Sequence, residues 1–221
     1  MTVTPEEHGG LREEVALAAR TLARHGLVNA FGHVSARDGD LVVITPPVAP
    51  GDVTADTLVT LDAAAGELPA GTAPETWAHL AIYRARPDVG AVVRAQPESG
   101  FAAAAIATEL VPLHGQAAWL GRRVPVHGAA RLLRDRERAE AAADTLADAD
   151  AVLLRGNGAL TVGETPGAAV ARMWLLEAAC RVHLATVGHG PRALTYDEID
   201  AWRVAAPPLM ERLWRHLAGL P

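Results

Sequence analysis

One stretch of the chain, ETWAHLAIYRARPDVGAVV (residues 75–93), contains the two patterns from which the rest of the fold can be worked out. Apolar residues recur in its first part at three- and four-residue spacing, which predicts a helix over residues 74–86 that ends before Pro87. Its end runs on into AVVRA (91–95), a short apolar run that predicts a buried strand, and Pro97 ends that strand. This part of the chain therefore predicts a helix that leads directly into a strand of the sheet.

Two hairpins flank this segment. Upstream, GHVSARDGDLVVITPP (32–47) contains two short strands around a DGD turn, and downstream AVLLRGNGALTVG (151–163) contains two strands around a GNG turn. Tight turns of this kind join antiparallel strands. Further helices are predicted at 10–26, 101–108, 131–148, 165–189 and 196–217. A strand-like segment is predicted at VPLHG (111–115), and a loop follows it through Pro125. The sequence predicts an α/β fold with a mixed sheet flanked by helices, in a single domain that spans residues 1–221.

The composition excludes several classes of function. All 20 basic residues are arginine, so the chain has no lysine amine to form an imine with a substrate or a cofactor. The net charge is -6, and the arginines are interleaved with acidic residues, so no basic face for nucleic acid is expected. The single cysteine, Cys180, excludes an internal disulfide and a zinc site built from several cysteines.

Targeting signals are not evident either. No apolar run approaches the roughly 18 residues that are needed to span a bilayer. The segment MTVTPEEHGG (1–10) lacks the apolar core of a signal peptide. We therefore expect a cytoplasmic protein that acts on a small molecule and has neither a membrane nor a nucleic acid as its partner.

Four segments, in order, resemble the class II aldolase/adducin family. The most specific features are H-x-x-I-Y-x-x-R-P-D-V-x-A-V-V and a later L-L-x-x-x-G-x-x-x-x-G-E-T. The resemblance implies a three-layer α/β/α fold around a mostly antiparallel central sheet, in a homotetramer with active sites at the subunit interfaces. It also implies aldol cleavage, epimerisation, dehydration or decarboxylation of small oxygenated substrates. The four segments are GLVNAFGHVSAR (26–37), LVVITPP (41–47), ETWAHLAIYRARPDVGAVV (75–93) and VLLRGNGALTVGETPGAAVARMWLLEAA (152–179).

The chain departs from this family at the metal site. The resemblance implies two histidines at alternate positions after AVV and a third before the hairpin glycine, but this chain has Arg94, Gln96 and Asn157 there. In the family the three imidazoles hold a divalent ion that polarises a carbonyl and stabilises an enediolate. Arginine cannot coordinate a cation, and amide oxygens are poor zinc ligands. We therefore expect no metal at this position and no cofactor.

Other family positions are matched only in part. Glu75, four residues before His79, matches the family's acid/base carboxylate; the alternative is a solvated glutamate stabilised by the start of its helix. The phosphate-binding residues differ, so a sugar phosphate is not the expected substrate. The form GHVSAR is more similar to members that act on carboxylates, including decarboxylases of aromatic acids and keto acids. The residues at the phosphate-binding positions are Ala73, Pro74 and Gly32-His33.

Arg94 lies on an apolar strand and therefore needs a partner, which can be of two kinds. Its guanidinium can bind a substrate carboxylate or enolate, with Gln96 and Asn157 as further hydrogen-bond donors. Alternatively it forms a structural ion pair with Glu75 or a nearby aspartate. His33 and His114 are further candidates for residues that line the substrate pocket.

Three functions remain open at this point. The first is a metal-independent lyase, an aldolase, decarboxylase or dehydratase, that acts on a small non-phosphorylated carbonyl or carboxylate metabolite. In this enzyme Glu75 would be the acid/base and Arg94 would replace the metal. The second is a non-catalytic binding or scaffold protein, as in the adducin branch of the family. The third is an enzyme whose divalent metal has moved to another set of ligands.

Overall fold

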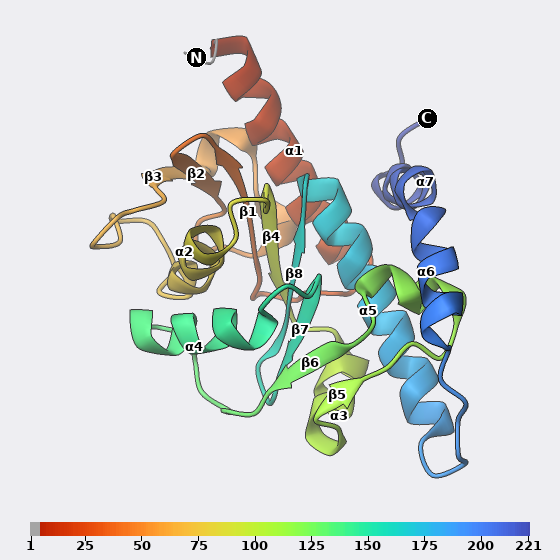
Figure 1. Ribbon diagram of the computed structural model, residues 1–221. Coiled ribbons are helices and arrows are strands. Elements are labelled where there is room, and N and C mark those ends of the chain that lie inside the picture. The colour runs from red at the N-terminus through yellow and green to blue at the C-terminus, as the bar shows by residue number, and fades with distance from the viewer. Residues whose placement is uncertain (1–4) are drawn as a thin grey trace.

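A computed structural model describes residues 5–221, in which eight strands form one sheet between helices (Figure 1). Residues 1–4, the start of the segment in which a leader was sought, lie outside the described residues. The strand order is β3-β2-β1-β4-β8-β7-β6-β5, and each neighbouring pair is antiparallel except β6 and β7. The strands are β1 (His33–Asp38), β2 (Leu41–Ile44), β3 (Val59–Asp62), β4 (Ala91–Ala95), β5 (Glu109–Leu110), β6 (Val124–His127), β7 (Ala151–Leu154) and β8 (Gly158–Gly163). The mostly antiparallel sheet and both predicted hairpins are confirmed.

Helices cover both faces of this sheet. The helices α1 (Pro5–Arg24), α3 (Glu98–Ile106) and α5 (Pro166–Thr186) pack on one face, and α2 (Thr76–Ala85) and α4 (Arg136–Leu146) pack on the other. Successive residues of β4 alternate between the two layers, so Val93 joins the core under α1 and α5 while Val92 joins the core under α2 and α4. The helices outside this arrangement are α6 (Tyr196–Val204) and α7 (Ala206–Ala218), which lie beyond α5 (Figure 1), and the short 3-10 helices η1 (Pro50–Asp52), η2 (Ala55–Thr57) and η3 (Gly115–Leu120). The predicted three-layer α/β/α arrangement is thereby confirmed.

The connection between β4 and β7 differs from the sequence-based prediction in two places. The strand predicted at residues 111–115 lies slightly earlier, as β5, and the predicted loop through Pro125 contains β6. A proline is compatible with the first residues of a strand near a sheet edge, which explains the missed strand. Helix α4 begins at Arg136 and not at 131, because Asp135 caps it by accepting a hydrogen bond from the backbone N–H of Arg138 at 2.9 Å. The preceding residues 128–134 are therefore left without helix or strand, and they reach the site described below.

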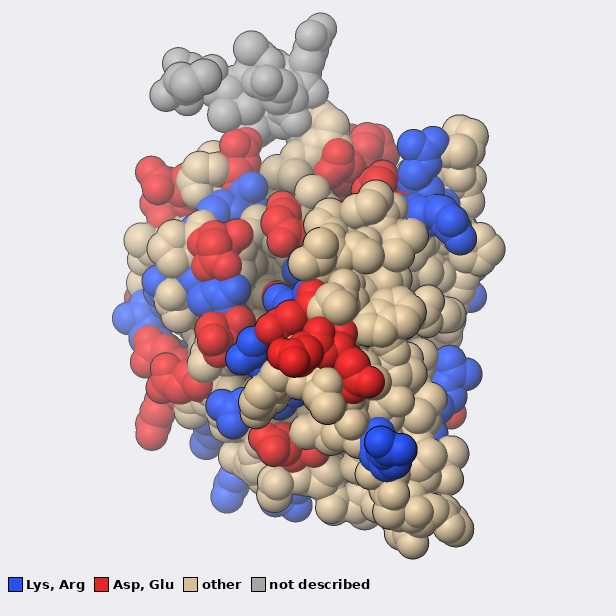
Figure 2. Space-filling view, turned by 45° about the vertical axis from the view of Figure 1, so that its right-hand side comes forward, with Lys and Arg blue, Asp and Glu red and all other residues tan. Residues whose placement is uncertain are grey.

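The surface agrees with the mixed charge pattern of the sequence. On the face drawn in Figure 2, arginines and acidic side chains are interspersed, and the described residues there form no broad basic patch. No helix within residues 5–221 is both long and apolar enough to cross a membrane.

Gly158, where the turn after β7 enters β8, gives a test of this fold. Its φ is +86°, and a Cβ built there would lie 2.1 Å from the carbonyl oxygen of Ala95. Because both the backbone conformation and the contact exclude a side chain, Gly158→Ala should lower the free energy of unfolding by about 2 kcal/mol or more. Gly10→Ala is the control, because Gly10 lies in α1 with open space around it and should gain up to about 1 kcal/mol. Urea unfolding at a fixed protein concentration measures both, and equal stability of the two variants would contradict the described packing of β4 against β8.

Candidate active site

A group of polar side chains is buried on the α2/α4 face, at the end of the sheet where β4 ends and β8 begins. His33 at the start of β1 is paired in register with Arg94 of β4, and Asn157 comes from the turn between β7 and β8. Glu75 is the N-cap residue of α2, and the charges of Glu75 and Arg94 both act on His33. Only 4 to 8% of each of these four residues is exposed. The fold thus brings two charged and two uncharged polar side chains, from four separate elements, into one nearly buried group.

Arg94 is held by an amide and not by a carboxylate. Its Nη2 donates to Oδ1 of Asn157 at 2.5 Å and to the backbone oxygen of Asn157 at 3.3 Å. Its Nε is buried and has no hydrogen-bond partner among residues 5–221. The ion pair considered between Arg94 and Glu75 is not what the structure has, because Glu75 pairs with Arg134. Arg94 is therefore a buried cation without a direct carboxylate partner in the described part of the chain.

Glu75 is buried under an exposed arginine. Arg134 Nε donates to Glu75 Oε1 at 3.1 Å, and the side chain of Arg134 is 56% exposed whereas that of Glu75 is 11% exposed. The alternative of a solvated glutamate is therefore wrong. Burial acts to raise the pKa of Glu75, but a backbone hydrogen bond, the hydrogen bond and charge of Arg134 and the charge of Arg94 together lower it below its usual value. In the free protein Glu75 is therefore an ionised carboxylate at neutral pH.

Two neutral histidines complete the group. Burial and then the positive charge of Arg94 lower the pKa of His33 to about 4, against the opposing effect of Glu75. Burial also lowers the pKa of His79, which lies edge-to-face with His33 at a ring separation of 6.3 Å. His79 Nδ1 is hydrogen-bonded to Ser35 Oγ at 2.7 Å, and Ser35 is in turn hydrogen-bonded to Tyr83 at 2.8 Å. Ring atoms Nδ1 of His33 and Nε2 of His79 are buried and have no hydrogen-bond partner among the described residues.

The two remaining predicted site residues lie in different places. Gln96 follows β4 and lies against Gly158, next to Asn157, with its backbone N–H donating to Leu27 at 3.0 Å. His114 is the N-cap residue of η3, a helix that packs against α5 and α6, and no described contact joins it to the group around Arg94. A role for His114 in the pocket stays a prediction, which depends on the expected assembly of subunits.

The sequence analysis did not identify Arg134, His79, Ser35 and Tyr83 as members of this group. Ser35 and Tyr83 could have been found, since Tyr83 lies four residues after His79 on one helix face and Ser35 lies two residues after His33 on one strand face. For Arg134 no such signal exists, because it follows an irregular segment in which no periodicity fixes the direction of a side chain.

The donor set does not fit the divalent metal that the family resemblance implies. Arg94 and Gln96 supply no good ligand, and the side-chain oxygen of Asn157 already accepts the hydrogen bond from Arg94. Among the side chains that the structure describes, those of residues 9–221, no group of three or more His, Cys, Asp or Glu lies close enough together to hold a metal ion.

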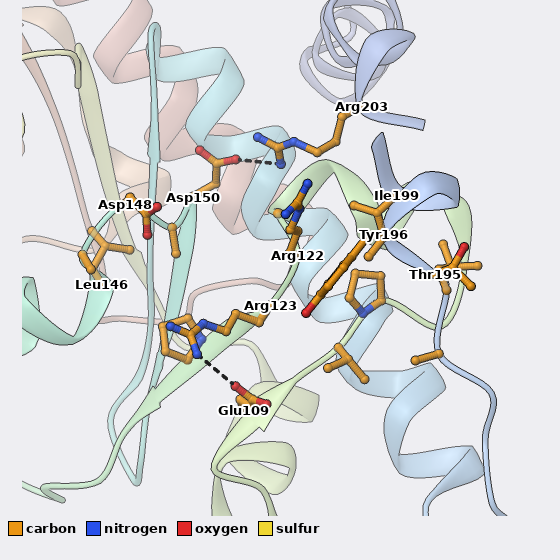
Figure 3. A pocket seen from close by; sticks show the side chains of 18 of the residues that line it. Glu109, Arg122, Arg123, Leu146, Asp148, Asp150, Thr195, Tyr196, Ile199 and Arg203 are labelled. Carbon is orange, nitrogen blue, oxygen red and sulfur yellow. Dashed lines mark hydrogen bonds and ion pairs between the residues drawn. The ribbon is translucent and has the colours of Figure 1, made fainter. Parts of the chain in front are cut away.

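A larger cleft, of about 1000 Å³, lies elsewhere, between β5, β6, the connection from α4 to β7, and α6 (Figure 3). Its arginines are paired with acidic residues: Arg123 lies 3.7 Å from Glu109, and Arg203 lies 3.5 Å from Asp150. These charges are matched, whereas the buried Nε of Arg94 and the buried ring nitrogens of His33 and His79 have no partner among the described residues. The candidate active site is therefore the buried group around Arg94.

Comparison with known proteins agrees with this fold. Residues 13–184 match the sequence model of the "Class II Aldolase and Adducin N-terminal domain" family. A stretch of 127 residues is 39% identical to 3,4-dihydroxyphthalate decarboxylase from Arthrobacter keyseri; it covers 52% of this chain and 51% of that protein, so the match spans about half the length of the relative.

Solved structures extend the likeness over most of the chain. An aldolase II superfamily protein from Pseudomonas syringae has a TM-score of 0.80 at 26% identity, with 97% of this chain and 92% of that chain covered. L-Fuculose-1-phosphate aldolase from Thermus thermophilus has a TM-score of 0.74 at 27% identity, with 81% and 96% covered.

The buried neutral state of His33 predicts a specific pH dependence of stability. Its pKa is about 4 when folded against 6.5 for an ordinary histidine, so between these values the unfolded chain binds the extra proton. The contribution of neutral His33 to the free energy of unfolding is complete above pH 6.5. About 3 kcal/mol of it is lost as the pH falls toward 4. Urea unfolding between pH 7 and pH 4 should therefore show a smaller loss for His33→Asn than for the wild type. Parallel curves for the two proteins would show that His33 is not buried in its neutral form.

Proposed function

Because the chain belongs to the class II aldolase and adducin family, we propose that it is a lyase-type enzyme in which Arg94, and not a metal ion, supplies the positive charge. The observation that carries this proposal is the state of Arg94: it is 4% exposed and is held by Asn157, and its Nε is unpartnered among the described residues. A buried charge without a counter-ion is costly, and a substrate anion would remove that cost.

The proposed chemistry is cleavage of a carbon–carbon bond beside an oxygenated carbon. When the bond breaks, its electron pair moves toward an oxygen of the substrate, and the guanidinium of Arg94 stabilises the charge that builds up there. In an aldol cleavage Glu75, which is ionised in the free protein, takes a proton from a substrate hydroxyl group, whereas in a decarboxylation it delivers a proton to the carbon that is left. Decarboxylation and aldol cleavage can both use these two groups, a fixed cation and a carboxylate that moves a proton; dehydration, which breaks a carbon–oxygen bond, would use the carboxylate to remove a proton from carbon.

The electrostatics around His33 support a substrate without a phosphate group. His33 stands where the family resemblance implies a phosphate-binding asparagine, and its pKa of about 4 keeps it uncharged at neutral pH. Arg94 is then the one buried cation of the described group, which suits a single carboxylate or enolate oxygen better than a doubly charged phosphate. The similarity to a decarboxylase of an aromatic acid favours decarboxylation among the lyase reactions.

We further propose that the protein is a homotetramer with its sites at subunit boundaries. Support comes from two exposed apolar side chains near the site: Phe31, two residues before His33, is 63% exposed, and Leu132, two residues before Arg134, is 48% exposed. Large apolar side chains in such positions are suited to being covered by another subunit.

Arg94→Ala tests the catalytic role of the guanidinium. In an enzyme that uses Arg94 as proposed, this change removes charge-assisted hydrogen bonds to the reacting group, so the rate should fall by about a hundredfold or more. Stability should fall by only about 1–3 kcal/mol, because the change leaves unsatisfied amide groups but strands no carboxylate. The assays are carbon dioxide release from 3,4-dihydroxyphthalate and from hydroxylated benzoates, calorimetric binding of benzoate, and thermal unfolding.

Arg155→Ala is the matched control, because Arg155 is an exposed arginine that lies two residues before Asn157 and donates to the backbone of Gly128. It should bind and react like the wild type. Unchanged benzoate binding by Arg94→Ala, or a wild type that neither binds nor converts any of these acids, would favour the non-catalytic scaffold.

A further inference from the structure

A second guanidinium lies over the site and is held there by Glu75. Beyond its bond to Glu75, the side chain of Arg134 has no hydrogen bond or ion pair within residues 5–221. The arginine is more than half exposed whereas the carboxylate is nearly buried. An ion pair with one solvent-exposed member contributes little to stability, so exchange of Glu75 for another anion costs Arg134 little.

The charges around Glu75 do not balance. Arg94 from β4 and Arg134 from the segment before α4 both act on Glu75, and His33 from β1 is uncharged at neutral pH. His79 on α2 is also neutral, because it is fully buried. The group thus contains two cations and one anion. A ligand with one carboxylate balances it when bound to Arg94, whereas a ligand with two carboxylates can also engage Arg134.

We propose that the substrate of this site is a dicarboxylate, with one carboxylate bound by Arg94 and the other bound by Arg134. Arg134 gives up its ion pair with Glu75 when it binds the second carboxylate. The assignment rests on the proposed function, since it takes Arg94 as the binding residue for the first anion. Arg134 is then a specificity-determining residue, because it distinguishes an acid with two carboxylates from an acid with one. Both bonds are charge-assisted, and guanidinium groups fit carboxylates in a bidentate geometry.

Departure of Arg134 changes the protonation of Glu75. Burial still raises the pKa of this carboxyl group, against a backbone hydrogen bond that lowers it, and the added negative charge of the ligand acts in the same direction as burial. Glu75 therefore takes up a proton from water when the dicarboxylate binds. In a decarboxylation the bond between the substrate carbon and the carboxylate carbon breaks and carbon dioxide leaves, while the electron pair stays with the substrate, shared between that carbon and the oxygen toward which Arg94 draws the charge. Glu75 then gives its proton to that carbon and, as a carboxylate again, pairs with Arg134.

Calorimetric titration of the full-length protein at pH 7 tests the proposal with phthalate, isophthalate and benzoate as probes. Titrations in two buffers of different ionisation enthalpy also give the number of protons taken up. The better of the two dicarboxylates should bind the wild type about tenfold or more tightly than benzoate, with uptake of roughly one proton. Benzoate should bind without proton uptake, since it leaves the pair of Arg134 with Glu75 intact.

Two variants with the same change in net charge distinguish a specific effect of Arg134 on ligand binding from an effect of the overall charge of the protein. Arg134→Gln should reduce the preference for the dicarboxylate to near unity. Arg136→Gln should keep it, because Arg136 is exposed and lies over the ring of Trp77, 5.2 Å from its centre. A preference and a proton uptake that survive in Arg134→Gln would overturn the proposal. If benzoate binding is lost in Arg94→Ala while Arg134→Gln keeps the preference, only the present inference fails; if no acid binds in an Arg94-dependent way, the proposed function fails as well.

Discussion

The burial of one positive charge is the constraint on which this site depends. Arg94 lies on β4 between Val93 and Ala95, which are both fully buried, and no side chain of the described chain other than that of Asn157 holds its guanidinium. Since a charge in such a place needs compensation, its neighbours are arranged around it. The positive charge helps to keep His33 neutral and Glu75 ionised. The cation is thus permanent, and in the proposed function the anion that matches it is the substrate.

Much of the fold could be predicted from the sequence because it is encoded locally. The DGD and GNG turns specify hairpins whatever the rest of the chain does, and the apolar spacing of residues 74–86 specifies helix α2. Strand β6 was predicted as part of a loop through Pro125, and the neighbours of a strand decide whether a proline is tolerated there. Similarly, α4 begins five residues later than predicted because Asp135 caps it. The residues before the cap are irregular, and they place Arg134 over the site.

The site could be predicted only as far as local geometry reaches. Alternation along β4 and the antiparallel pairing with β8 bring Arg94 toward the hairpin turn, and the structure joins it to Asn157 there. The arginine that pairs with Glu75 is decided by the tertiary structure, because the possible partners lie on distant segments. The sequence analysis considered only Arg94. The site of the family needs lone pairs that point at a metal, whereas this one has a guanidinium that donates hydrogen bonds. The ligand that fits such a centre is therefore an acceptor that carries a negative charge.

The central claim is that Arg94 takes the place of a metal and binds a carboxylate, and one crystallographic measurement tests it most directly. Crystals soaked with zinc and with phthalate would be measured at the zinc absorption edge, so that one data set shows both the anion and any metal. The account predicts a carboxylate within hydrogen-bond distance of the Arg94 guanidinium and no anomalous peak between Arg94, Gln96 and Asn157. A zinc peak at that position, or a carboxylate bound in the cleft without contact to Arg94, would contradict it.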